Sequence, residues 1–174
     1  MISPELYKNV FRRHAASVAV IATRSGAHVQ GMTATAFTAV SLKPPLVLFC
    51  VHRASSTHQA LDVGNLVGVS LLSCGQQDLS DRFSSKGPDR YFLDDLRLDR
   101  SPHGAPVIPD ACAVLEVALA YRYWGGDHSI FMGTVTWADD RPHLAPLIYH
   151  SGSYASVVST DHLQKPPFEL AAAE

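Results

Sequence analysis

The sequence predicts a mainly β protein, an antiparallel barrel with a few peripheral helices. Three observations lead to this class. Short apolar or alternating stretches recur along the 174 residues, few segments have helical spacing, and no strand–helix–strand rhythm indicates a parallel sheet. Apolar residues make up 47% of the chain and charged residues 17%, which is enough apolar material for a buried core. We expect a single domain at residues 1–160, without internal repeats, and a C-terminal tail at 161–174.

The chain is expected to begin with a helix. Ser3 suits the N-cap and Pro4 the first helical position, and Leu6, Val10 and Phe11 then share one helical face. The next expected elements are strands at 18–23, 31–37, 46–51 and 65–73, with a turn at Ser25-Gly26 and a Pro-interrupted connection at 41–45.

Two more helices and a hairpin are expected further along. The helices are a short one capped by Ser55 or Ser56 and running to Leu61, and one at 76–83, where Leu79 and Phe83 lie one turn apart. Residues 84–110 are polar and rich in Gly and Pro, which indicates a long surface excursion. The hairpin strands are 113–124 and 129–138, joined by the turn residues Gly125-Gly126-Asp127, and a last short strand is expected at 146–150.

Composition argues against several classes of partner. Fourteen Lys and Arg against 16 Asp and Glu give a net charge of -2, which provides no field for a nucleic acid backbone or an anionic membrane surface. Cys50, Cys74 and Cys112 form no C-x-x-C pair, so a disulfide framework is not expected and a reducing compartment is. No signal peptide or membrane-spanning run is evident. We therefore expect a cytoplasmic location.

The familiar catalytic and metal motifs are missing. The sequence contains no G-x-G-x-x-G, no P-loop and no G-x-S-x-G elbow, which disfavours a Rossmann site, a nucleotide triphosphatase and a hydrolase. The nine histidines include no H-E-x-x-H and no H-x-x-x-H pair, so no metal ligand is expected, although remote residues could still assemble a zinc site.

Hydroxyl-bearing and small residues concentrate in two stretches, 33–41 and 53–57. The second combines Arg53, Ser55, Ser56 and Thr57 at the start of an expected helix, and a phosphate prefers such donors. The alanines of the first stretch would let a flat ring approach the backbone. An ordinary strand and an ordinary capped helix remain the alternative interpretations.

An ordered set of motifs resembles the flavin reductase-like, FMN-binding split-barrel proteins. The set spans about residues 10–154 and comprises Gly31-Met32-Thr33-Ala34-Thr35-Ala36-Phe37, Val40-Ser41-Leu42, Arg53-Ala54-Ser55-Ser56-Thr57, Asp81-Arg82-Phe83, Gly126-Asp127-His128, and 146–150 before Gly152-Ser153-Tyr154. The resemblance implies a Greek-key split barrel, a homodimer, and an NAD(P)H:flavin oxidoreductase that uses FMN or FAD with NADH or NADPH. It also implies a partner monooxygenase that receives reduced flavin by diffusion.

The resemblance also implies the roles of individual residues. Contacts to the isoalloxazine and ribityl chain would come from Thr33, Ala34, Thr35, Ala36, Val40 and Ser41, with Cys50, Val51 and His52 beside the ring. The phosphate end would be surrounded by Ser56, Thr57, Arg82 and Phe83, which agrees with the phosphate site inferred above from Arg53 and Ser55. Asp127, His128 and Tyr154 would lie on the nicotinamide side.

His128 is the candidate catalytic residue, because in the family this histidine favours correct stacking of nicotinamide on flavin. The resemblance implies direct hydride transfer from nicotinamide C4 to flavin N5, so His128 would help to position the rings and would not be a required acid or base. Asp127 is expected to shape the turn. For Tyr154, ordinary barrel packing is an equal alternative, and for His128 a solvated turn residue is the alternative.

Three details depart from the family pattern and leave other functions open. Trp124 precedes the turn where a smaller or acidic residue is usual, Asp89-Arg90-Tyr91 replaces a usual Asp-Lys-Phe, and His52 places a titratable group beside the ring. The alternatives are a flavin-binding electron-transfer module without its own NAD(P)H oxidation, and a barrel that binds a non-flavin ligand.

Overall fold

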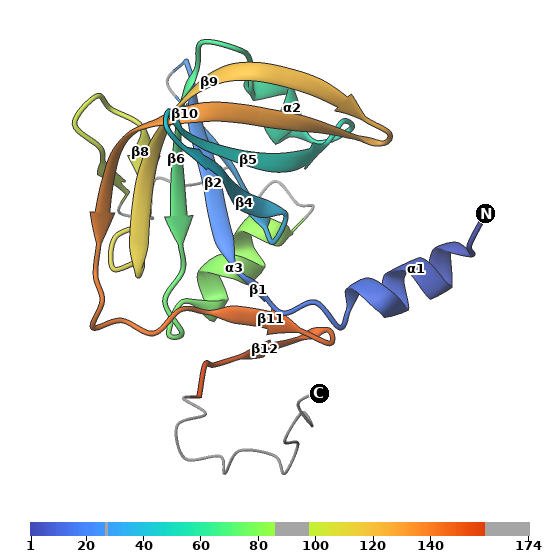
Figure 1. Ribbon diagram of the computed structural model, residues 1–174. Helices are drawn as coiled ribbons and strands as arrows, with labels where there is room; N and C mark the ends of the chain where they lie inside the picture. The colour runs from blue at the N-terminus through green and yellow to red at the C-terminus, as the bar shows by residue number, and fades with distance from the viewer. Residues whose placement is uncertain (27, 86–97, 159–174) are drawn as a thin grey trace, which may run out of the picture.

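Seven strands form one strongly curled antiparallel sheet in the order β3-β2-β6-β9-β10-β5-β4 (Figure 1). The structure is a computed structural model that describes residues 1–26, 28–85 and 98–158. The strands of this sheet are β2 Ala19–Ser25, β3 His28–Ala34, β4 Phe37–Leu42, β5 Pro45–His52, β6 Leu66–Leu71, β9 Ala113–Gly125 and β10 His128–Asp140. Within the described ranges β3 and β4 are the two edges and do not pair.

The expected split barrel is therefore confirmed, and its chain path is of the Greek-key type. Strand β5 precedes β6 in the chain, yet it lies beside β10 at the far side of the β6-β9-β10 group. Its side chains alternate between the barrel interior and the outer face, as the period of a strand requires. Phe49 and Val51 are fully buried in the interior, where the ring of Phe49 stacks on that of Phe131 at 5.8 Å between centroids.

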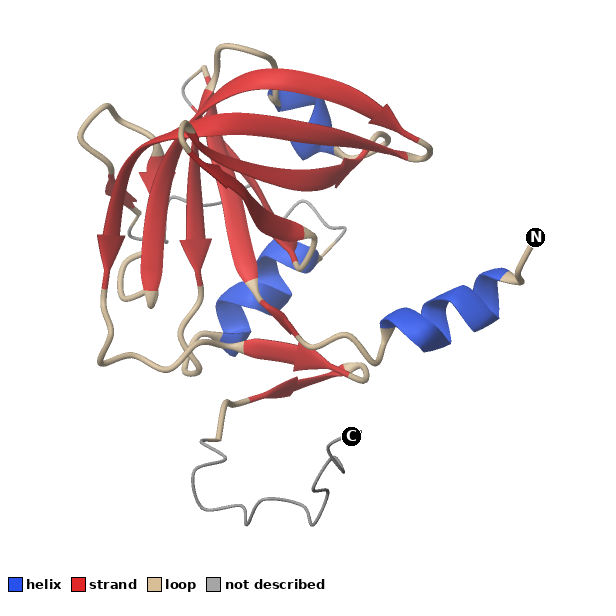
Figure 2. Cartoon of the chain, in the orientation of Figure 1, coloured by secondary structure: helices blue, strands red, loops and turns tan. Residues whose placement is uncertain are grey.

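The helices are peripheral, as expected (Figure 2). They are α1 Pro4–Phe11, α2 Ser56–Ala60 and α3 Gln77–Ser84. Ser3 caps α1 by accepting a hydrogen bond from the backbone N–H of Leu6 at 3.1 Å, so the predicted start of this helix is confirmed. Helix α1 extends away from the barrel and buries none of its side chains. No helix of the described residues is long and apolar enough to cross a bilayer.

Two small sheets complete the fold, and neither was predicted in full. One contains β1 Ala16–Ser17, β11 Ile148–His150 and β12 Ser153–Ala155, and the other contains β7 Asp99–Arg100 and β8 Pro106–Val107. The predicted single strand at 146–150 is thus shorter, and a tight turn at Ser151-Gly152, both with positive φ, leads into β12. The predicted excursion at 84–110 carries β7 and β8. Residues 86–97, including the Asp89-Arg90-Tyr91 departure, and the expected tail at 161–174 lie outside the described residues.

The predicted strand at 31–37 was wrong in its bounds, and so was the connection at 41–45. Strand β3 ends at Ala34, the chain passes Thr35 and Ala36, and β4 then continues to Leu42. The reason is tertiary, because β3 pairs with β2 at one edge of the sheet and β4 with β5 at the other. The chain must cross the open side of the barrel between them, and no Gly or Pro marks that break.

A fully buried carboxylate fixes the segment that follows β7 to the barrel. Glu116 of β9 accepts hydrogen bonds from the Ser101 hydroxyl, from Thr136 Oγ1 at 2.7 Å, and from His103 through its backbone N–H at 3.2 Å and Nδ1 at 2.6 Å. Burial alone would raise the pKa of Glu116, but these hydrogen bonds outweigh it and lower the pKa to about 2. The carboxylate is therefore charged and fully satisfied.

We predict that Glu116 makes stability depend on acidic pH. A carboxyl whose pKa falls from 4.5 unfolded to about 2 folded stabilises the protein above pH 4.5, and this contribution, about 3 kcal/mol, is lost as the pH falls toward 2. Glu116→Gln should lower the free energy of unfolding at neutral pH by a similar amount and flatten the acid dependence. Urea unfolding over a pH series measures both, with the exposed Glu5→Gln as control. Equal stability of Glu116→Gln and wild type at neutral pH would contradict the charged state.

Candidate functional site

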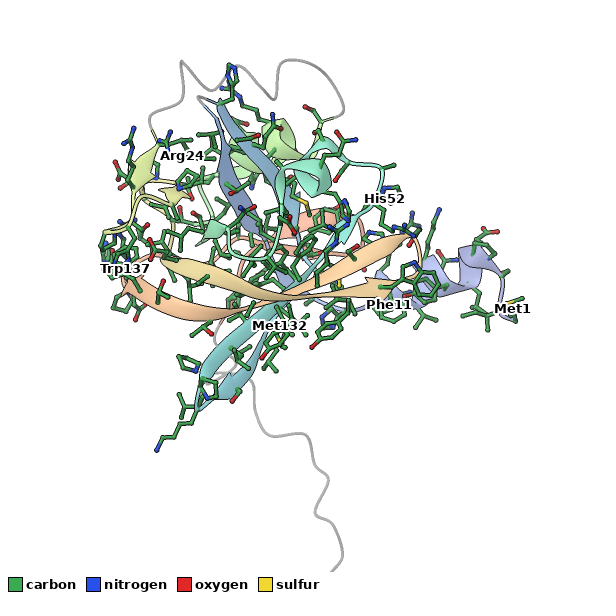
Figure 3. The ribbon with its side chains drawn as sticks, turned by 90° about the horizontal axis from the view of Figure 1, so that it is seen from above. Met1, Phe11, Arg24, His52, Met132 and Trp137 are labelled. Atoms are coloured by element: carbon green, nitrogen blue, oxygen red, sulfur yellow. The ribbon has the colours of Figure 1, made fainter. Side chains whose placement is uncertain are left out.

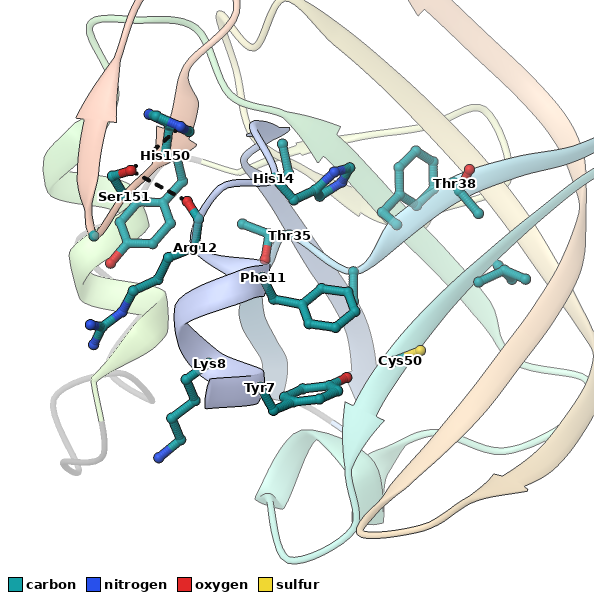
Figure 4. Close-up of a pocket in the computed structure, with 16 residues that line it drawn as sticks. Tyr7, Lys8, Phe11, Arg12, His14, Thr35, Thr38, Cys50, His150 and Ser151 are labelled. Atoms are coloured by element: carbon teal, nitrogen blue, oxygen red, sulfur yellow. Dashed lines mark hydrogen bonds between the residues drawn. The ribbon is translucent and has the colours of Figure 1, made fainter. Parts of the chain in front are cut away.

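A groove of about 550 Å³ lies between α1 and the outer face of β5 (Figure 4). Tyr7 and Phe11 project from α1 toward the strand that carries Cys50, and the wall is mostly apolar. Further lining comes from the crossing between β3 and β4 and from the β11–β12 turn. The lining residues that were predicted from the sequence are Thr35, Ala36 and Cys50.

The alternation of β5 decides which predicted side chains reach this groove. Cys50 and His52 lie on the outer face, whereas Val51 points inward and is fully buried, so Val51 offers a ligand only its backbone. The Cys50 N–H donates to the Ala36 carbonyl at 3.0 Å, which holds the crossing segment against β5. Burial raises the pKa of the Cys50 thiol, so the groove contains a neutral thiol at neutral pH.

Two other predicted contacts, Thr57 and Phe83, are buried where α2 and α3 meet β3. Thr57 Oγ1 donates to the Gly31 carbonyl at 3.0 Å, and a Cβ at Gly31 would lie 2.7 Å from the Phe83 ring. Both side chains are at most 1% exposed. They therefore position the two helices against β3, and contact of these two residues with a ligand stays a prediction.

Part of the predicted hydroxyl set serves the fold. Thr33 Oγ1 donates to the Ser80 carbonyl of α3 at 2.6 Å, so the hydrogens of both Thr33 and Thr57 are already used. Ser55 Oγ accepts from the His58 N–H as the α2 cap, which leaves the Ser55 hydrogen available. Ser55 and the exposed Arg53 therefore offer donors that an anion can use near α2.

The remaining predicted residues are not among those that line the groove. Ala34 is buried at the end of β3, while Ser56 begins α2 and Arg82 lies in the last turn of α3. Val40 and Ser41 lie on the edge strand β4, where a bulge shifts the register between Ala39 and Ser41, and neither is among the residues lining the groove.

A histidine pair stands at the end of the groove strand. His128 of β10 lies opposite His52 of β5, with the rings edge to face at 5.1 Å between centroids. His128 Nδ1 lies 2.7 Å from Asp127 Oδ1, and this hydrogen bond lowers the pKa of the Asp127 carboxyl. His52 Nδ1 accepts from the Ala54 N–H at 3.2 Å. These contacts leave the Nε2 atom of each imidazole for a ligand.

Within one folded chain, Tyr154 does not lie beside His128. It lies on β12 against α3, its phenol oxygen 2.5 Å from Asp81 Oδ1 and 2.9 Å from Ser80 Oγ, beside a second cavity of about 360 Å³ that Thr33 and Thr35 also line. Burial and then the hydrogen bond to Asp81 raise the pKa of this phenol. Tyr154 thus fastens the small sheet to α3.

Sequence reasoning missed a cluster on the inner face of the β9–β10 hairpin. His58 of α2 is buried and its Nε2 lies 2.9 Å from Ser129 Oγ and 3.3 Å from Arg122 Nη2. The turn residues at 125–127 could have predicted this cluster. A hairpin that turns there pairs Trp124 with Ser129 and Arg122 with Phe131, and paired residues lie on the same face of the two strands. Among the described residues, no group of three or more His, Cys, Asp or Glu could hold a metal ion.

We predict that Tyr154→Phe lowers the free energy of unfolding by about 1.5 kcal/mol, because it removes a hydrogen bond to a carboxylate. The phenolate titration followed by ultraviolet absorbance should also lose its highest-pH component, since the pKa of Tyr154 is raised. Tyr149→Phe is the matched control, because Tyr149 packs edge to face on Tyr154 at 5.6 Å. A Tyr154→Phe variant as stable as wild type would show that the phenol does not hold β12.

Known proteins are similar to this chain in both sequence and fold. At 37% identity over 151 residues, an NADH-dependent FAD reductase of Streptomyces globisporus matches 84% of the chain and 82% of its own length. The reductase subunit of a flavin-dependent monooxygenase of Mycobacterium tuberculosis is 32% identical over 158 residues, which is 90% of the chain and 83% of that subunit.

A solved structure of a flavin reductase is also similar to this fold. The Streptomyces globisporus NADH:FAD oxidoreductase in complex with NAD and FAD fragments superposes with a TM-score of 0.83 at 33% identity, covering 92% of this chain and 98% of that one. The profile of the flavin reductase like domain matches residues 11–158, which is most of the chain. The resemblance drawn from the ordered motifs is thereby confirmed, and the chain belongs to the flavin reductase like domain family.

Proposed function

We propose that the chain is an NAD(P)H:flavin oxidoreductase that reduces FMN or FAD and supplies the reduced flavin to a partner monooxygenase. The observation that carries this proposal is the groove lined by Thr35, Ala36 and Cys50. Cys50 lies on β5, which ends at His52, and the His52 ring packs against that of His128. The names of relatives support it, since they include an NADH:FMN oxidoreductase and a monooxygenase reductase subunit.

The groove fits a flat ring system. Its volume of about 550 Å³ is within the range of small-molecule sites, and Phe11, Phe37 and Leu48 give it apolar walls. The small side chains of Thr35 and Ala36 leave their backbone accessible to the edge of a ring. The hydroxyl of Ser55, the N-cap of α2, offers a donor for the flavin phosphate. When bound, the flavin supplies the hydride acceptor.

His128 orients the nicotinamide. In the tautomer that donates Nδ1–H to Asp127, the His128 imidazole offers Nε2 as an acceptor for the carboxamide N–H of the nucleotide. Asp127 holds the ring at this angle, and the Arg53 N–H, which donates to the Asp127 carbonyl at 3.0 Å, fixes the turn. The chemistry needs no proton from the protein, so orientation is the contribution of this group.

We predict that His128→Ala raises the KM for the nicotinamide nucleotide about tenfold, the loss of roughly 1.4 kcal/mol from one positioning hydrogen bond. The Kd for flavin should change much less. Steady-state oxidation of NADH and NADPH with FMN and with FAD measures the first, and quenching of flavin fluorescence the second. The exposed His143→Ala is the control.

Other outcomes would favour the alternatives. Unchanged kinetics in His128→Ala would contradict the role given to this residue. Flavin binding without oxidation of either nucleotide would contradict the reductase and favour an electron-transfer module. If neither flavin is quenched or raises Tm, the barrel binds a different ligand.

The protein is further proposed to act as a homodimer in the cytoplasm. Leu6, Tyr7, Val10 and Phe11 of α1 are each more than half exposed, and such an apolar face indicates an interface. Cys50, Cys74 and Cys112 form no disulfide, which supports the expectation of a reducing compartment.

Light scattering tests the homodimer. We predict a mass about twice the 18.8 kDa of the chain for wild type, and a monomer for the double variant Leu6→Glu/Val10→Glu, because two buried charges oppose association. The exposed Val63→Glu, in the loop between α2 and β6, should stay dimeric. A monomeric wild type would contradict this proposal.

A further inference from the structure

A further pocket, separate from the groove and from the cavity beside Tyr154, lies near the tip of the β9–β10 hairpin. It has a volume of about 220 Å³ and is lined by Arg53, Arg122, Tyr123, Trp124 and Ser129. Trp124 and Arg122 pair with Ser129 and Phe131, whose side chains point into the barrel, whereas His128 and Ile130 point to the outer face. The pocket is thus on the inner face of the hairpin and is distinct from the groove beside Cys50.

The pocket is positively charged. Among the described residues no carboxylate forms an ion pair with Arg53 or Arg122. Arg122 instead approaches His58 Nε2 at 3.3 Å and lies over the Phe131 ring at 5.6 Å. Burial, followed by the charges of Arg122 and Arg53, lowers the pKa of His58, so this imidazole is neutral and adds no charge. Two guanidinium groups therefore share the pocket with only neutral partners, and an anion would complete it.

An aromatic surface borders these charges. The Trp124 side chain is 75% exposed and lies on the same face of the hairpin as Arg122, so it offers an aromatic ring to a ligand beside the guanidinium groups, whereas the Tyr123 side chain pairs with Ile130 on the outer face. A phosphate recognised by arginine next to a base stacked on an aromatic ring is the chemistry of a nucleotide. The buried Ser129 hydroxyl adds a polar group to the floor.

We propose that this pocket binds the adenosine-phosphate end of a dinucleotide, with the adenine on Trp124 and the phosphate between Arg53 and Arg122. The inference rests on the proposed function and extends it. Arg53 directly follows His52, so the two neighbours connect the inner pocket with the groove face of β5. A dinucleotide whose reactive ring lies at the groove can therefore pass around the hairpin tip. FAD and NAD(P)H both carry such an end, and FMN does not.

Binding can be measured without any enzyme activity. The chain has two tryptophans, and Figure 3 places Trp137 on the opposite side of the barrel from His52. In a Trp137→Phe background the fluorescence reports Trp124 alone. Titration with AMP should change this fluorescence saturably, and adenosine, which lacks the phosphate, should bind more weakly. Adding Arg122→Gln should weaken AMP binding about tenfold, as expected for loss of one charge-assisted contact. Adding Arg24→Gln, which removes an equal charge across the barrel, should not (Figure 3).

Steady-state kinetics then identify the source of the adenylate. If Trp124→Leu raises the ratio of the KM for FAD to that for FMN, the pocket serves the flavin. If it raises the KM for NADH with both flavins, the pocket serves the nicotinamide nucleotide. Either result supports the proposal. An AMP titration without response, or the same AMP affinity in Arg122→Gln, overturns it.

Two further outcomes are decisive. If Trp124→Leu turns a dimer into a monomer and AMP does not bind to the wild type, a second copy covers the pocket and the proposal is wrong. If AMP binds but the wild type oxidises neither nucleotide, the proposed reductase function fails while the pocket stands.

Discussion

The arrangement of the site depends on the close approach of two helices to Gly31 of β3. The Phe83 ring of α3 occupies the space that a Cβ would need, and Thr57 of α2 donates to the Gly31 carbonyl. Since α2 follows β5 directly and α3 also accepts a hydrogen bond from Thr33, this one contact sets both helices relative to the groove. A glycine is required here for its lack of a side chain, because the neighbouring ring leaves no room.

The β9–β10 hairpin separates two kinds of chemistry by strand alternation. Its outer face carries His128 opposite His52, and its inner face carries Arg122 and Trp124. A slip of one residue would exchange the two sets, so the register must be fixed. Bulges between Met132 and Gly133 and between Val135 and Trp137 interrupt regular pairing at defined points, and a Cβ at Gly133 would lie 2.4 Å from the Ala118 carbonyl.

Several buried polar groups are satisfied by hydrogen bonds within the fold. Glu116 accepts from Ser101, His103 and Thr136, and its charge is stable because these donors replace water. The same need for partners explains why Thr33 and Thr57 turn their hydroxyls toward backbone carbonyls. A stretch rich in hydroxyls therefore overstates the number of donors that a ligand can use, since part of them must satisfy the packing between helices and sheet.

Local patterns determined the elements that depend on neighbouring residues: the capped start of α1, the buried run of β5, and the hairpin around 125–127. The order of short motifs also determined the family, and with it the groove residues Thr35, Ala36 and Cys50. Only the tertiary structure decided the break between β3 and β4, the burial of Val51 and Phe83, the distance of Tyr154 from His128, and the meeting of Arg53 with Arg122. Each of these depends on which strands pair across long stretches of chain, and in which register. The free energy of such pairing arises between distant segments, so a local sequence pattern cannot predict it.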